Sequence, residues 1–387
     1  MVISILNHCV YLLHRACKIP SETKCKRKAF LCAQGGVRPE TRIGAAHGHR
    51  LATVACRTGR PLCGVRCSRG PELHYGWNMK IWVGVTDKDW FQHLNQINAD
   101  EVNFWQPSGS RVFRALQPGE PFLFKLHSPD NFIVGGGHFV RHSALPISLA
   151  WDAFGPKNGV GSLEELNTRV RRYRRNDTSL DPVIGCNVLA EPFFLQRSAW
   201  IPVPANWAPN IVQGKTYDTA MPDGRALWNS LQTVLSDNQK VGEPAIFEGL
   251  YGENRFGAEY LTRCRLGQGA FRVLVTDAYE RRCAVTGEKT LPVLEAAHIK
   301  PYVLHGPHRV NNGILLRSDV HKLFDLGYMT VTPELTLKVS PKLKTEWQNG
   351  REYYAHHGQK LRIQPADLAS QPSREFLSWH NENRFRA

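Results

Sequence analysis

The chain has 387 residues, 42% of them hydrophobic, which is enough for two or three domains with apolar cores. No run approaches the roughly 20 consecutive apolar residues of a membrane span, so we expect no membrane partner. The net charge of +15 favours a nucleic-acid partner, but +10 of it lies in residues 1–78, which hold 13 Lys and Arg against 3 Asp and Glu.

Residues 1–78 differ from the rest of the chain in composition. They contain seven of the ten cysteines, no Asp, and no sustained hydrophobic period. Three interpretations compete: a zinc or disulfide module, a targeting peptide, and an extension translated from a start codon set too early. The cysteine spacings and the missing basic start favour the third, so we expect this segment to be disordered or outside the native protein. The three scattered thiols that remain, Cys186, Cys264 and Cys283, indicate a reducing cytoplasm.

The first folded region begins at Met79. Glycines Gly135 to Gly137 lie between strand-like residues and predict a bulge or a close backbone approach. Alternation and apolar stripes predict strands at 81–85, 122–126, 132–140 and 184–189, and helices at 88–97, 163–173 and 223–235.

Three features of this region carry a resemblance. They are the sequence GEPFLFKL at 119–126, the sequence GGGHFV at 135–140, and the aromatic pair Phe104 and Trp105. Together they resemble the PUA-like superfamily, which includes the EVE and SRA readers of modified bases. The resemblance implies a β-barrel domain over 79–236 that holds a flipped base between aromatic faces. Phe104 and Trp105 would contact DNA, although each is as well explained as core.

A basic cluster ends the helix predicted at 163–173. It includes Arg171 and Arg172, which either form a solvated helix face or contact phosphates. A polar, Gly-rich segment without periodicity predicts a linker at 237–264, followed by a second domain over 265–387. That domain opens with an apolar helical stripe at Phe271, Leu274, Val275, Ala278 and Tyr279.

The stretch from Cys283 to Gly327 predicts strand, loop, strand and helix. The first strand, 291–299, ends near His298, and Asn312 opens the second at 314–316. We expect the helix to begin after an N-cap at Ser318 and to stop at Gly327. His321 and Asp325 lie one turn apart and share a face of that helix. A hairpin at 328–339 and a helix from Ser373 complete the domain.

The order EAAHI, then NGILLRSDVHKLFDLG, closely resembles the HNH nuclease family, whose fold is the ββα-metal finger. The resemblance implies that His298 is the general base that activates water. It implies that Asn312 holds the loop and orients the base. His321 would be a ligand of a divalent ion, with Asp325 as a second ligand. Mg²⁺ is the expected ion, with Mn²⁺ or Ni²⁺ as alternatives.

The sequence departs from the family in two places. Many members carry Asp or His immediately before the base, whereas this chain has Ala297, so Glu295 is the substitute ligand that we expect. Many members also hold a structural zinc with two cysteine pairs. Here Thr286 stands at the position that would pair with Cys283, so we expect no structural zinc. We treat His305 and His308 as solvated or phosphate-facing.

The sequence therefore predicts an α+β protein in which a PUA-like domain precedes an HNH nuclease. We expect a metal-dependent cytoplasmic endonuclease that hydrolyses double-stranded DNA and restricts foreign DNA. Base-modified DNA is a candidate substrate, and a homodimer is a candidate assembly. Two alternatives stay open. One is a nuclease independent of modification, in repair or as a toxin, and the other is a DNA-binding protein whose nuclease domain is inactive.

Overall fold

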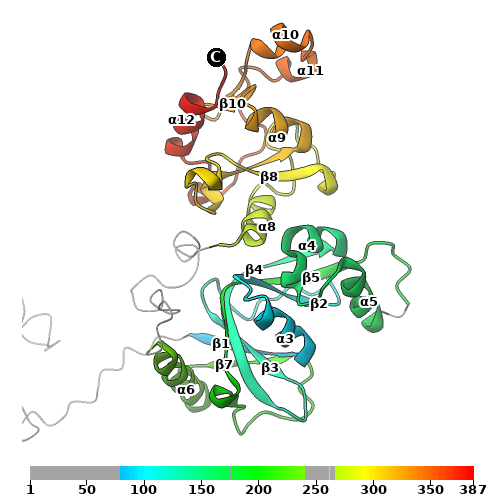
Figure 1. The fold of residues 1–387 in the computed structure, drawn as a ribbon, viewed down its shortest axis with the longest axis vertical. Coiled ribbons are helices and arrows are strands. Elements are labelled where there is room, and N and C mark those ends of the chain that lie inside the picture. The colour runs from blue at the N-terminus through cyan, green and yellow to red at the C-terminus, as the bar shows by residue number, and fades with distance from the viewer. Residues whose placement is uncertain (1–78, 175, 240–260, 262–265) are drawn as a thin grey trace, which may run out of the picture. The chain divides into compact units, whose positions relative to one another are not determined.

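The structure is a computed structural model that describes residues 79–174, 176–239, 261 and 266–387 (Figure 1). The segment 1–78, most of the expected linker 237–264, and Cys264 lie outside the described residues. None of the described helices is long and apolar enough to cross a membrane.

A seven-stranded mixed sheet organises the first region. Its order is β2-β5-β4-β3-β1-β7, with β6 pairing β4, and only β1 and β3 run parallel. The end strands β2 and β7 do not pair with each other in the described part of the chain, so the pairing does not close there. The strands are β1 (Lys80–Thr86), β2 (Glu101–Gln106), β3 (Pro121–Leu126), β4 (Phe132–Pro146), β5 (Val183–Phe194), β6 (Ile201–Pro202) and β7 (Gly214–Asp218).

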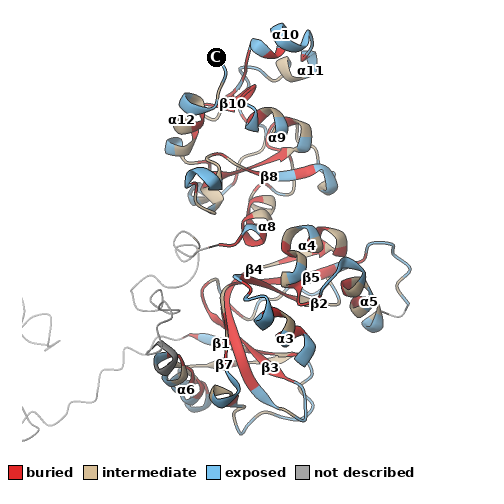
Figure 2. Cartoon of the chain, in the orientation of Figure 1, coloured by how far each residue is buried: buried red, intermediate tan, exposed pale blue. Residues whose placement is uncertain are grey.

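Four helices accompany this sheet. Helix α3 buries Trp90, Phe91 and Leu94, at i, i+1 and i+4, against an aromatic cluster that includes Phe122 and Phe124. Figure 2 shows the strands largely in the buried class and the outer helix faces exposed. The helices are α3 (Lys88–Gln96), α4 (Ile147–Phe154), α5 (Leu163–Tyr173) and α6 (Pro222–Gln239).

The predicted elements of this region are confirmed, with two strands longer than expected. Strand β4 continues to Pro146 and β5 to Phe194, because the two pair along their length. The predicted close backbone approach also holds. A Cβ at Gly135 would lie 2.4 Å from the Phe193 carbonyl oxygen, and the register between β4 and β5 shifts after Gly136.

Helix α8 (Gln268–Ala278) has two buried faces. Ala270, Val273 and Leu274 pack into the core of the first region, together with residues of β4 and β5. Phe271 and Val275 pack into the core of the predicted finger. Leu274, which the sequence groups in one apolar stripe with Phe271 and Val275, therefore packs into the core of the first region and not into that of the finger. The helix belongs to both cores.

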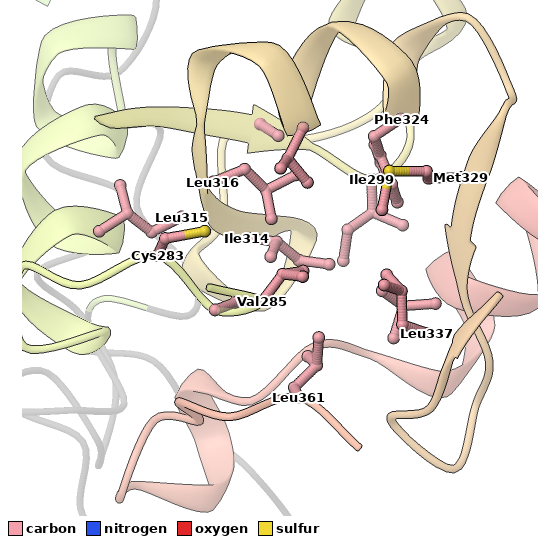
Figure 3. Close-up of a cluster of buried hydrophobic side chains, with 14 of the residues drawn as sticks. Cys283, Val285, Ile299, Ile314, Leu315, Leu316, Phe324, Met329, Leu337 and Leu361 are labelled. Atoms are coloured by element: carbon pink, nitrogen blue, oxygen red, sulfur yellow. The ribbon is translucent and has the colours of Figure 1, made fainter. Parts of the chain in front are cut away.

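The predicted finger is present as β8 (Leu294–His298), β9 (Gly313–Arg317) and α9 (Ser318–Asp325). Figure 3 shows its core, in which Cys283, Ile314, Leu316 and Phe324 gather. The N-cap expectation is wrong: Arg317 is the N-cap, Ser318 is the first helical residue, and no side chain caps the helix.

Short elements complete the C-terminal half. The stop at Gly327 is confirmed, since its φ of +78° is left-handed and a Cβ there would meet the Arg384 carbonyl oxygen at 2.0 Å. The remaining elements are β10 (Met329–Val331), β11 (Leu337–Val339), α10 (Lys342–Trp347), α11 (Arg351–Tyr354) and α12 (Arg374–Asn383).

Candidate active site

His298 is the last residue of β8 and pairs with Gly313 of β9. The Phe271 ring of α8 lies parallel to the imidazole, with centroids 3.9 Å apart and planes at 14°. His298 Nε2 lies 2.9 Å from His308 Nδ1. The predicted base is thus fixed by a ring face and by a hydrogen bond to a second histidine.

Asn312 is fully buried at the start of β9 and closes the loop between the two strands. Its Oδ1 accepts a hydrogen bond from the Lys300 amide, and its Nδ2 donates to the carbonyls of Lys300 and Pro307. These three bonds tie the beginning of the loop to its end. The arrangement is what the predicted loop-holding role requires, and the effect of Asn312 on catalysis stays a prediction.

His321 of α9 faces the same strand. Its Nδ1 lies 2.5 Å from Glu295 Oε2, and its Nε2 lies 3.3 Å from Asp325 Oδ2. The structure therefore brings together all three predicted metal ligands. Ala297, by contrast, is fully buried in the finger core.

Glu295, His321 and Asp325 could supply two ligands to one divalent ion, but not three. Glu295 and Asp325 contact opposite nitrogens of one imidazole, so the two carboxylates do not converge on a point. Correspondingly, the described residues contain no group of three or more His, Cys, Asp or Glu side chains arranged to hold a metal ion. Mg²⁺ is commonly held by one or two carboxylates and completes its shell with water and substrate phosphate oxygens, whereas an imidazole ligand suits ions such as Ni²⁺.

A cleft of about 620 Å³ opens over these side chains. Its lining includes the predicted base, the predicted ligands and two arginines, Arg272 of α8 and Arg384 after α12. Asp152 and Ala153 of α4, from the first region, form part of its wall. The cleft is thus large enough for a segment of sugar-phosphate backbone and has positive charge beside the carboxylates.

Two groups in the cleft have shifted pKa values. Burial, together with smaller contributions from the neighbouring His308 and His321, lowers the pKa of His298 to about 4. The ring is therefore neutral at pH 7 and able to accept a proton. Desolvation raises the pKa of Asp325, against the opposite effects of His321 and Arg384.

The predicted DNA-contacting residues lie away from this cleft. Phe104 is buried in the aromatic core beside Trp90, and Trp105 donates its indole N–H to the Asn158 carbonyl while packing on a core. Arg171 donates to the carbonyls of 179 and 180, whereas Arg172 is exposed at a shallow depression beside α5. Only Arg172 of the four is free to meet a phosphate without rearrangement.

Two further residues contribute to the site: His308, which we treated as solvated or phosphate-facing but which is half-buried against the base, and Glu101, which sequence reasoning missed. His308 contacts the base directly. Glu101 of β2 is fully buried, accepts bonds from the Gly269 and Ala270 amides of α8, and pairs with Lys157. The spacing of His308 before Asn312, inside the loop that Asn312 closes, was the available signal for the first. No local pattern pointed to Glu101.

A sequence model of the HNH endonuclease family matches residues 283–332. No curated protein matches the chain. Among solved structures, ASCH from Zymomonas mobilis is similar at 10% identity, over 38% of this chain and 94% of that chain, with a TM-score of 0.27. TagI, a modification-dependent restriction endonuclease, is similar at 12% identity, over 73% of this chain and 75% of that chain, with a TM-score of 0.24.

The residues matched by this family model include β8 and α9, which line the cleft. Residues 283–332 are an HNH endonuclease region, and the chain is a DNA-cleaving hydrolase of α+β fold. Nucleases of this family generally use a divalent metal ion.

Proposed function

We propose that the protein is a metal-dependent restriction endonuclease that cuts foreign, base-modified double-stranded DNA. The convergence of His298, His321 and Asp325 on one cleft carries the nuclease part of this proposal. The separate β-rich region, expected over 79–236, would supply selectivity, and 265–387 would supply the chemistry. The scattered, buried thiols Cys186 and Cys283 favour the reducing cytoplasm as the setting.

The neutral imidazole of His298 accepts a proton from water, and the resulting hydroxide oxygen attacks the phosphorus. The phosphodiester bond to the sugar oxygen breaks, and that oxygen is protonated from solvent. A divalent ion held by His321 and Asp325 would stabilise negative charge on the leaving oxygen. Arg272 and Arg384 hold the phosphate. One such site cuts one strand, so we propose that two copies of the chain act on a duplex.

The test compares matched plasmids with and without cytosine modification, in Mg²⁺, Mn²⁺ and Ni²⁺. We expect the wild type to cut the modified plasmid, and His298→Ala to lose the 10²–10⁴-fold typical of a missing general base. The His298→Ala protein should still bind DNA.

Three outcomes separate the alternatives. Equal cleavage of both plasmids would leave a nuclease independent of modification, and absence of cleavage with retained binding would leave a DNA-binding protein. Wild-type turnover by His298→Ala would show that another residue is the general base.

Trp105→Ala in the full-length chain tests whether Trp105 contacts a modified base. Base stacking contributes roughly 1–3 kcal/mol, so affinity for modified DNA should fall about tenfold or more if Trp105 stacks on a base.

A further inference from the structure

A histidine pair lies at the centre of the site. His298 Nε2 and His308 Nδ1 are 2.9 Å apart, and the two rings meet at 63°. Two imidazoles at this distance share one hydrogen, because one nitrogen must donate and the other must accept. The direction of that bond decides which nitrogen of His298 carries its proton.

The position of His308 is set by its surroundings. The Tyr302 ring stacks on it, with centroids 4.3 Å apart and planes at 14°. Asn312 Nδ2 holds the carbonyl of Pro307, the residue immediately before it. Because the Phe271 ring fixes His298 from the other side, both partners of the bond have defined positions.

Only one direction of the bond leaves His298 able to act. If His298 Nε2–H donates, the proton is on Nε2, and Nδ1 keeps a lone pair for a water proton. If His308 Nδ1–H donates, the proton of neutral His298 is on Nδ1 and the Nε2 lone pair is occupied, so neither ring nitrogen has a free lone pair for a water proton. A doubly protonated His308 could only donate, so the active pair needs a neutral His308.

The charges around His308 act in both directions. Desolvation lowers its pKa, Glu101 and Asp100 raise it, and Lys157 lowers it. The net direction is downward, which keeps His308 neutral at pH 7 and available as an acceptor.

We propose that His308 is a positioning residue, which accepts a hydrogen bond from His298 Nε2–H and so holds the base in the tautomer with a free Nδ1. The role rests on the proposed function of His298. In this role His308, which lies in a loop, affects catalysis through His298 and does not contact the substrate.

Two variants of His308 separate its acceptor from its ring. His308→Asn keeps an acceptor oxygen near the place of Nδ1 but loses the ring, whereas His308→Phe keeps the ring on Tyr302 but cannot accept. We expect His308→Asn to stay within about fivefold of wild-type kcat, and His308→Phe to lose about 10–10²-fold in kcat, part of a general base's contribution, with KM unchanged. Circular dichroism and Mn²⁺ affinity should match the wild type in both.

Each remaining outcome contradicts the role. Equal kcat in the two variants, whether high or low, or a more active His308→Phe would show that the acceptor does not matter. Weakened Mn²⁺ binding in both would make His308 a ligand. If the wild type itself cuts no DNA under any condition, the proposed function fails first, and that result is distinguishable because it does not involve the variants.

Discussion

At the scale of single residues, His298 is deprotonated at pH 7 and so able to accept a proton, but its low pKa makes it a weak base. A pKa of about 4 keeps His298 neutral at pH 7, yet a general base works best when its pKa is near the working pH. Bound DNA changes this balance. A phosphate beside the ring favours the protonated form and raises the pKa. The free enzyme thus keeps the base deprotonated, and substrate binding makes it stronger.

The contacts of His321 also indicate which of two carboxylates, Glu295 or Asp325, would bind the metal ion directly. His321 Nδ1 contacts Glu295, and a metal-bound histidine commonly donates its other ring N–H to a carboxylate. The geometry therefore favours Asp325 as the ligand and Glu295 as the residue that orients His321.

We expect Asp325→Asn to weaken Mn²⁺ binding more than Glu295→Gln does. Losing an outer carboxylate typically costs 10–100-fold in metal affinity, so Glu295→Gln sets the lower bound of the effect. Calorimetric titration of the folded proteins gives both constants. A larger effect of Glu295→Gln would restore Glu295 as the direct ligand.

At the scale of elements, helix α8 depends on a residue that is distant in sequence. Its N-cap, Gly267, offers no side chain, and the first turn is instead satisfied by Glu101 of β2. A carboxylate at a helix N-terminus also benefits from the helix dipole. Since α8 carries Phe271, which stacks on His298, this contact links the sheet to the catalytic ring.

We expect Glu101→Gln to lower the free energy of unfolding by about 1–3 kcal/mol, because it weakens buried charge-assisted bonds and leaves Lys157 without its buried partner. Asp100→Asn is the matched control. It removes the other carboxylate that contacts Lys157. Because the Asp100 side chain is 68% exposed, this change should cost less than about 0.5 kcal/mol. Urea unfolding of both variants checks the difference, and equal losses would remove the capping role.

Local patterns predicted most elements and the finger, and they failed where distant residues decide. Strand alternation and apolar stripes located β1, α3, β8 and α9, since each pattern reports burial of its own segment. They could not show that Leu274 faces the sheet, because a stripe does not name its partner. The hydrogen bond between His298 and His308 could not be predicted for a similar reason. The path of the loop that carries His308 depends on three hydrogen bonds of Asn312.

At the scale of the whole molecule, buried histidines connect stability to pH. Burial lowers the pKa of both His138 and His380 to about 4. Each is nearly inaccessible to solvent. The unfolded chain therefore binds protons below pH 6.5 that the folded chain does not.

We expect stability to be complete above about pH 6.5 and to fall progressively as the pH drops toward 4. Each of these two histidines should contribute a loss of about 2 kcal/mol at pH 5 relative to pH 7.5. Urea unfolding at the two pH values measures the difference, and His380→Asn should reduce it. Identical unfolding free energies at both values would contradict the prediction.

The double-sided burial of α8 also limits how this architecture can be recombined. If the first region were exchanged for another sheet, α8 would lose the partner of Ala270, Val273 and Leu274 and the cap from Glu101. Functional chimeras should therefore need a donor sheet that supplies both an acid at the position of Glu101 and a matching apolar surface. Proteins with this shared helix should therefore diversify more readily by substitutions within the first region than by exchange of the whole region.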